Sequence, residues 1–114
     1  MADCLFCSII DGRIPGAIVY KDDRVVAFKD INPQAPMHIL VVPRRHIATL
    51  NDLTSGDDDL VGEMIRRGGI LATEHGHADA GYRTVFNCNA GAGQTVFHIH
   101  LHVLGGRRFT WPPG

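Results

Sequence analysis

The chain has 114 residues, a length that fits one domain spanning residues 1–114. It is 45% hydrophobic with a net charge of −1, which argues against nucleic acid or an anionic membrane as a partner. No apolar run approaches the roughly 20 residues of a membrane span, and no basic stretch leads into an apolar segment near Met1, so the predicted location is the cytoplasm.

The N-terminal half predicts helix, hairpin, loop and strand in that order. Residues 38–43 are β-branched and apolar on both faces, which indicates a central strand. Residues 30–37 hold Pro33 and Pro36 and predict a loop. The other elements expected here are a short helix over 5–10 and two strands over 17–20 and 25–29.

The C-terminal half predicts a long helix, two strands and an extended tail. Apolar residues recur at helical spacing after Thr54 and Ser55, either of which can cap the helix, and Gly76 is the expected stop. Gly68–Gly69 either weakens this helix or allows close packing. Strands are expected over 83–89 and 96–104, followed by a tail over 105–114. Strands with two separated helices predict an α+β fold with an antiparallel sheet.

Three histidines alternate with apolar residues in the last expected strand. His98, His100 and His102 would lie on one face, because successive side chains of a strand point to opposite faces. Clustered titratable side chains of this kind indicate a functional site. A neutral imidazole is a good nucleophile for phosphorus, and His100 is best placed because it has a histidine on each side.

The segment before the histidines predicts an anion-binding loop. Gly91 and Gly93 allow backbone N–H groups to converge, and Gln94 and Thr95 add side-chain donors. Asn87 at the end of the preceding strand adds an amide. A tight turn is the alternative reading of such a loop. Its position beside three imidazoles favours a bound phosphate, and hence phosphoryl or nucleotidyl transfer.

A metal site competes for the same histidines. The spacing Cys4-x-x-Cys7 is typical of a metal-ligand pair, and His46 and His98 can complete a Cys₂His₂ tetrahedron. The alternative is that both cysteines are small apolar residues of the first helix.

Five further residues are candidates with simpler alternatives. His38 either orients a triad histidine or faces solvent. Asp30 can accept hydrogen bonds from a ribose or serve a turn, and Phe28 and Ile31 can wall a base pocket or belong to the core. Trp111 is too apolar to lie free in water, which favours docking on a partner subunit.

The sequence resembles the histidine triad (HIT) superfamily, in its Hint branch. The run 98–104 is similar to the His-x-His-x-His-x-x signature. Further segments that are similar to Hint sequences are Cys4-Leu5-Phe6-Cys7, residues 30–38, Pro43-Arg44-Arg45-His46, Ala92-Gly93-Gln94-Thr95 and Trp111-Pro112-Pro113-Gly114.

This resemblance implies a homodimer in which two five-stranded antiparallel sheets form one ten-stranded sheet. It implies a purine nucleoside phosphoramidase that releases an amine and AMP or GMP without a catalytic metal. The resemblance implies that His100 is the nucleophile, that His38 supports it through a hydrogen-bond relay, and that His102, Asn87 and the Gly93 backbone contact the phosphate. Thr95 would contact the phosphate or the leaving group, Asp30 the ribose, and Phe28 and Ile31 the base. Trp111 in the tail 105–114 would shape the partner's site, and structural zinc would bind to Cys4, Cys7, His46 and His98.

Thr95 departs from the resemblance, because many relatives carry Ser there. The hydroxyl is kept, but the methyl restricts the rotamer and is expected to slow protonation of the leaving group. Two other functions stay open: a dinucleoside polyphosphate hydrolase, against which the Trp-Pro-Pro-Gly ending speaks, and a nucleotide-sensing or scaffold protein with incidental hydrolysis.

Overall fold

The computed structural model describes residues 4–114, so residues 1–3 of the predicted domain lie outside it. The helices are α1 (Leu5–Ile10) and α2 (Asp58–Glu74), and the strands are β1 (Ile18–Lys21), β2 (Val25–Lys29), β3 (Met37–Pro43), β4 (Tyr82–Val85) and β5 (Leu101–Gly105). Three 3₁₀ turns accompany them: η1 (Leu50–Asp52), η2 (Ser55–Asp57) and η3 (Ala90–Ala92). No helix within residues 4–114 combines the length and the apolar composition that a membrane crossing requires.

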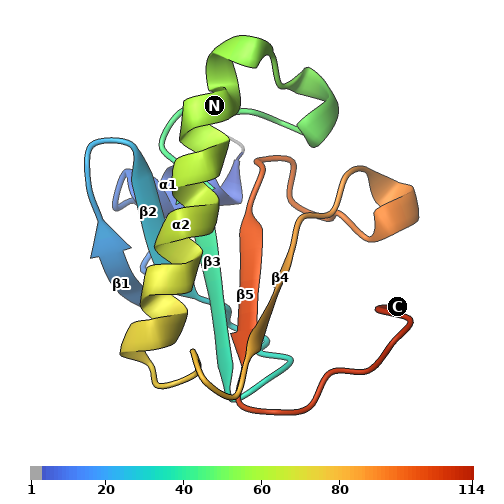
Figure 1. Cartoon of the computed structure of the whole chain (residues 1–114). Helices are drawn as coiled ribbons and strands as arrows, with labels where there is room; N and C mark the ends of the chain where they lie inside the picture. The colour runs from blue at the N-terminus through green and yellow to red at the C-terminus, as the bar shows by residue number, and fades with distance from the viewer. Residues whose placement is uncertain (1–3) are drawn as a thin grey trace.

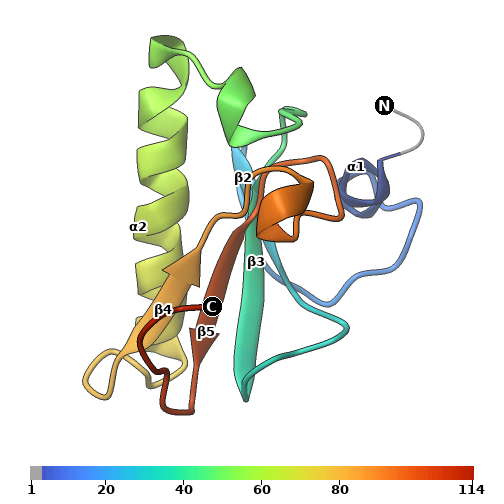
Figure 2. The same cartoon turned by 90° about the vertical axis from the view of Figure 1, so that its right-hand side faces the viewer.

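The five strands form one antiparallel sheet in the order β1-β2-β3-β5-β4, which confirms the α+β prediction (Figure 1). β3 is central, and all seven of its residues are buried. Helix α2 covers one face of the sheet, whereas α1 lies on the other side (Figure 2). The sheet therefore has two apolar layers, one under each helix.

Side chains that alternate along the strands contribute to both apolar layers. On the α2 side the core contains Ile39 and Val41 of β3 with Met64 and Leu71 of α2. On the α1 side, Leu40 and Val42 pack with Phe6 and other buried residues. Each strand thus presents one set of side chains to α2 and the other to α1.

Gly68 lies where α2 packs closely against β5. A Cβ on this residue would lie 3.0 Å from Cγ2 of Val103 and 3.1 Å from Cδ2 of Leu101. The close-packing alternative is therefore correct for Gly68. The helix ends at Glu74, and Gly76 follows with a φ of +83°, as the sequence predicts.

The expected strand over 96–104 is wrong at its start, because β5 begins only at Leu101. The register pairs Val41 with Leu101, so a continued ladder would place Ile99 opposite Pro43. Proline has no N–H to donate, and its carbonyl already accepts a hydrogen bond from Nε2 of His98 at 2.7 Å. The N–H of Ile99 instead donates to the Ile47 carbonyl at 2.7 Å. The strand expected over 83–89 is likewise limited to Tyr82–Val85.

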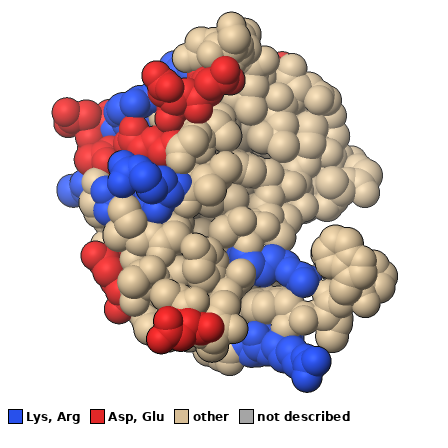
Figure 3. Space-filling view, viewed as in Figure 1, with Lys and Arg blue, Asp and Glu red and all other residues tan. Residues whose placement is uncertain are grey.

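Charged side chains of both signs are mixed over the upper left of the molecular surface in Figure 3. This mixing fits the net charge of −1. Salt bridges elsewhere in the structure join Arg24 to Glu63 at 2.8 Å and Arg13 to Asp11 at 3.1 Å. Exposed pairs of this kind contribute little stability, typically below about 1 kcal/mol.

Candidate active site and metal centre

The three histidines of the sequence motif share one side of the sheet even though only His102 belongs to β5. His98 and His100 precede the strand, yet their rings lie on the α1 side, where Phe6 contacts both. The ring centroid of His100 is 4.9 Å from that of His102 and 5.0 Å from that of Phe6. The alternation that predicts a common face therefore holds beyond the end of the ladder.

His100 has one ring nitrogen bound and one free to act. Its Nδ1 lies 2.8 Å from the main-chain oxygen of His98. Because a carbonyl only accepts, Nδ1 carries the proton and Nε2 carries a lone pair. Burial lowers the pKa of His100, which is 8% exposed, so the ring is neutral at pH 7. A neutral imidazole with a fixed tautomer is a nucleophile held ready for attack.

His38 fixes the tautomer of His102 in the same way. The N–H of Gln34 donates to Nδ1 of His38 at 3.0 Å, so the proton of His38 is on Nε2. That Nε2 donates to Nδ1 of His102 at 2.9 Å and also lies 3.4 Å from Oδ2 of Asp30. Nε2 of His102 therefore carries a proton and can donate it to an anion.

Burial lowers the pKa values of these histidines, and their mutual proximity adds to the effect. The pKa of His102 falls to about 4, first through burial and then through its neighbours His100 and His38. Burial also lowers the pKa of His38, although the carboxylate of Asp30 opposes the shift. The site thus holds neutral rings at pH 7, each with a defined donor nitrogen.

The expected relay from His38 to His100 does not run through a direct hydrogen bond between these two rings. The hydrogen bond of His38 goes to His102, and Nδ1 of His100 is bound to a carbonyl instead. Any support that His38 gives to His100 therefore runs through His102, whose ring lies against that of His100.

The glycine loop before the histidines is a tight turn. The N–H of Gly93 donates to the Ala90 carbonyl at 3.0 Å, and the N–H of Gln94 donates to the Asn89 carbonyl at 3.1 Å. Gly93 has a φ of +89°, a conformation that glycine adopts without strain. The Gly93 N–H is thus engaged within the turn, and the phosphate contact expected of the Gly93 backbone stays a prediction.

Gln94 holds this loop in place rather than presenting a side chain to a ligand. Its side chain is buried, accepts from the N–H of Asn89 at 2.7 Å, and donates to the carbonyls of Ala48 and Val96 at 2.8 and 3.1 Å. All of its hydrogen-bonding groups are engaged by the backbone, so the prediction of a free donor at Gln94 is wrong.

The remaining predicted nucleotide contacts differ in placement. Phe28 is buried, with its ring edge against Phe6 at a centroid distance of 5.3 Å. Asp30 is half-buried beside His38 and accepts from the N–H of Asn32 at 2.8 Å. The others differ in exposure: Asn87 is half-buried, Thr95 is exposed, Ile31 is 97% exposed and Trp111 is 83% exposed.

Phe6 is the residue that sequence reasoning missed. It was expected only in the first helix, but its ring lies against Phe28, His98 and His100. Its place between Cys4 and Cys7 was the available signal, because a metal on those cysteines would hold Phe6 beside His98.

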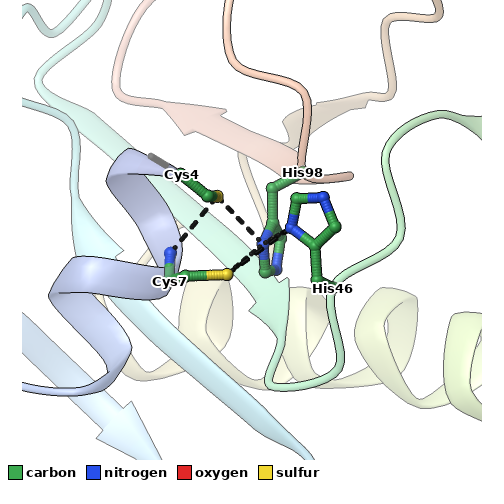
Figure 4. Close-up of side chains that lie close together, drawn as sticks. All are labelled: Cys4, Cys7, His46 and His98. Carbon is green, nitrogen blue, oxygen red and sulfur yellow. Dashed lines mark hydrogen bonds between the residues drawn. The ribbon is translucent and has the colours of Figure 1, made fainter. Parts of the chain in front are cut away.

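The second cluster brings together Cys4, Cys7, His46 and His98, the four residues expected to bind metal (Figure 4). The sulfurs of Cys4 and Cys7 each lie 3.5 Å from Nδ1 of His98. Nδ1 of His46 lies 3.5 Å from the Cys7 sulfur and 3.2 Å from Nδ1 of His98. The four ligand atoms all lie within 4.8 Å of one another.

These distances fit a tetrahedral zinc site. With Zn–S near 2.3 Å and Zn–N near 2.05 Å, adjacent sulfur and nitrogen ligands lie about 3.5 Å apart and two nitrogens about 3.3 Å apart. The proton of His98 is on Nε2, because that atom donates to the Pro43 carbonyl, and its Nδ1 lone pair faces the cluster. Burial lowers the pKa of His98 to about 4 and raises that of the Cys7 thiol. The donor set and its orientation are those of a structural zinc site.

The sequence model of a family described as "Scavenger mRNA decapping enzyme C-term binding" matches residues 3–108. A HIT family hydrolase from Legionella pneumophila superposes with a TM-score of 0.96 and 52% identity, covering 98% of this chain and 100% of that one. The chain belongs to the histidine triad (HIT) superfamily. Purine nucleoside phosphoramidase of Escherichia coli K12 is 47% identical over 92% of this chain and 88% of its own length, which places this HIT protein in the Hint-like branch.

The HIT relatives identify this chain as a hydrolase, and one of them is a zinc-bound protein. Solved structures similar to this chain include HIT family hydrolases from Legionella pneumophila and Clostridium thermocellum, and this HIT protein is an enzyme of that class. A zinc-bound histidine triad protein from Mycobacterium smegmatis is 32% identical with a TM-score of 0.81, covering 99% of this chain and 81% of that one. The Cys/His cluster of the present chain can therefore be compared with a relative that holds zinc.

Proposed function

We propose that this HIT hydrolase cleaves the P–N bond of adenosine and guanosine 5′-phosphoramidates through a nucleotidyl intermediate on His100. The observation that carries the proposal is the tautomer of His100, whose Nδ1–H is bound to a carbonyl so that Nε2 keeps its lone pair. The name of the Escherichia coli relative supports the substrate class.

In the first step, Nε2 of His100 attacks phosphorus, and the bond from phosphorus to the amine breaks. The amine takes a proton from a neighbouring donor, for which Thr95 and Nε2 of His102 are the candidates. The N–H of His102 stabilises the charge on the phosphate oxygens, since its tautomer is fixed through His38. Asn87 adds a second donor beside the same oxygens.

In the second step, water attacks phosphorus and the bond to Nε2 of His100 breaks. Water supplies the oxygen of AMP or GMP, and its proton replaces the one that left with the amine. The Nδ1–H of His100 stays on the His98 carbonyl throughout, so the ring returns in its starting tautomer. The cycle uses imidazole and N–H groups of the chain, and we propose no catalytic metal.

The nucleoside is held by residues around α1 and the end of β2. Asp30 accepts hydrogen bonds from the ribose hydroxyls, and Phe28 and Ile31 wall the base pocket. Phe6 joins this wall, because its ring lies between Phe28 and His100. Gly93 and Gln94 act on the phosphate through the loop conformation that they fix.

We propose that two copies join into a homodimer with a ten-stranded sheet. β4 is an edge strand of the sheet formed by residues 4–114, and an unpaired edge can accept a further strand. The tail 105–114 leaves the body beyond β5 (Figure 1), and Trp111 is 83% exposed there. A partner site shaped by Trp111 would explain why an indole is placed in this way.

The cluster of Cys4, Cys7, His46 and His98 is proposed to bind one structural zinc ion per chain. Its support is the fit of its distances and the zinc-bound mycobacterial relative. Ligating thiols require a reducing compartment, which favours the cytoplasm. Metal analysis of protein purified without added metal is expected to give about one zinc per chain.

The experiment that tests the function compares two substrate classes. We expect a higher kcat/KM on an adenosine 5′-phosphoramidate than on a diadenosine polyphosphate, because the Trp-Pro-Pro-Gly ending and the Hint-like relatives both favour the first. The reverse order would support the polyphosphate hydrolase. Tight AMP binding without turnover of either substrate would support a nucleotide sensor.

A further inference from the structure

We propose that Cys4, Cys7 and His46 are positioning residues for the nucleophile: by holding a metal together with His98, they fix the His98 carbonyl and the Phe6 ring against which His100 is oriented. This inference rests on the proposed function of His100. It gives the metal centre a part in turnover beyond holding the fold together.

The first connection runs through His98, which belongs to both clusters. Its side chain is fully buried, with Nε2–H bound to the Pro43 carbonyl and Nδ1 facing the two sulfurs. Its main-chain oxygen accepts the Nδ1–H of His100 at 2.8 Å. A shift of His98 therefore moves the one acceptor that keeps the His100 proton on Nδ1.

The position of the segment that carries His98 depends on the side-chain contacts of this residue. Residues 94–100 lie outside the sheet ladder, because β5 begins at Leu101. One backbone hydrogen bond, from Ile99 to Ile47 at 2.7 Å, ties the histidine-bearing part of this segment to the 44–50 loop. His46 comes from that same loop, so a metal held by His46 and His98 would join the two segments a second time.

The second connection runs through α1. This helix has only six residues, and helices of that length are not stable without tertiary contacts. Cys4 caps it by accepting from the Cys7 N–H at 3.4 Å, so both cysteines lie on its first turn. Phe6 lies between them in sequence, and its ring meets the His100 ring edge-on at 5.0 Å. Freeing the cysteines would loosen the wall against which His100 packs.

The test uses variants of His46, whose ring lies against Cys7 and His98. We expect His46→Ala to lose the metal and His46→Cys to keep it, because Cys₃His is a common structural zinc set. The control is Lys21→Ala, which removes an exposed side chain at the end of β1. Metal content, kcat and KM on an adenosine phosphoramidate, and the ¹⁵N NMR shifts of the His100 ring would be measured for each protein.

The expected result is a loss of kcat of about tenfold to a hundredfold in His46→Ala, the scale associated with a small misplacement of a reacting group. The ¹⁵N shifts should show His100 distributed between two tautomers in that variant alone. His46→Cys and Lys21→Ala should match the wild type in metal content, kcat and tautomer.

A metal-free His46→Ala protein with wild-type kcat and a single His100 tautomer would overturn the proposal. So would unfolding of the metal-free protein, whether made by substitution or by chelation, because the cluster would then serve the fold as a whole. The NMR reading needs no turnover, so a wild type inactive on phosphoramidates would contradict the proposed function while the positioning role is still tested.

Discussion

Two histidine clusters lie next to each other in this protein, and they differ in where the ring protons are. In the Cys/His cluster, Nδ1 atoms of His46 and His98 face each other at 3.2 Å with two sulfurs beside them, so several lone pairs converge on one point. In the proposed catalytic cluster of His38, His100 and His102, the Nδ1 atoms of His100 and His102 are each bound to a neighbour, which leaves their Nε2 atoms for a ligand.

In both clusters, the hydrogen bond made by one ring nitrogen of a histidine decides what the other ring nitrogen can do. His98 and His100 are two residues apart, and each donates to a backbone carbonyl. His98 donates from Nε2 and presents Nδ1 to the sulfurs, whereas His100 donates from Nδ1 and presents Nε2. One becomes suited to a metal and the other to phosphorus, although the side chains are identical.

Replacing His100 should have the largest effect, and it distinguishes the role of one cluster in turnover from the role of the other in metal binding. His100→Ala should lower kcat by about 10⁴-fold or more, since removal of a covalent nucleophile has effects of that size. Zinc content should be unchanged, because His100 is not one of the four residues of the Cys/His cluster and its Nδ1 is bound to the His98 carbonyl. Steady-state kinetics and metal analysis of one preparation would check both expectations.

His102→Ala is the companion variant, with an expected loss of about 10²–10³-fold because it removes a donor to the phosphate rather than the nucleophile. A His100→Ala enzyme within tenfold of the wild type would contradict the assignment of roles.

Removing Gln94 should weaken the loop that leads to both clusters. Gln94→Ala leaves the Asn89 N–H and the carbonyls of Ala48 and Val96 without their side-chain partner. We expect a loss of about 2–4 kcal/mol in the free energy of unfolding, measured by urea denaturation. Gln34→Ala is the matched control, because that side chain is exposed and should change stability by less than about 0.5 kcal/mol. Equal stabilities of the two variants would show that the Gln94 contacts are not needed.

The pH dependence of turnover should reflect the buried state of the catalytic cluster. Attack requires neutral His100, and burial lowers its pKa below the ordinary value of about 6.5. The neutral form therefore persists as the pH falls through 6.5, and the acid limb of kcat/KM should have its midpoint below that value. A midpoint at or above 6.5, with the fold intact by circular dichroism, would mean that the nucleophile is not desolvated.

The smallest expected effect concerns the methyl group of Thr95. Thr95→Ser keeps the hydroxyl and frees its rotamer, so kcat should stay equal or rise by less than about threefold. Thr95→Ala removes the hydroxyl and should lower kcat by about tenfold or more on a substrate with a poor leaving group. Wild-type kcat in Thr95→Ala would exclude the hydroxyl from leaving-group protonation.

Much of the fold could be predicted because hydrophobic patterning is local. The two-faced burial of β3 follows from the apolar run 38–43, and the end of α2 follows from its helical stripe and the glycine at position 76. The predicted N-cap at Thr54 or Ser55 is wrong, because Thr54 caps the 3₁₀ turn η2 and Asp57 is the N-cap of α2. The metal cluster was predictable too, since the Cys4-x-x-Cys7 spacing is a recognisable ligand pattern and only a few histidines can complete it.

The errors came from interactions between distant segments. Pro43 ends the ladder opposite the histidine run, which could not be seen without the register of β3 and β5. Gln94 reaches the backbone at Ala48, a contact across 46 residues that no local motif indicates. Phe6 meets His100 only after α1 folds against the sheet.

Mass spectrometry of the covalent intermediate can show directly whether His100 is the nucleophile. The protein would be denatured rapidly during turnover of an adenosine phosphoramidate and digested with trypsin, and the peptide Thr84–Arg107 would be fragmented by mass spectrometry. The account predicts an added AMP mass on His100 and no added mass in His100→Ala. An adduct on His98 or His102, or turnover without any adduct, would contradict it.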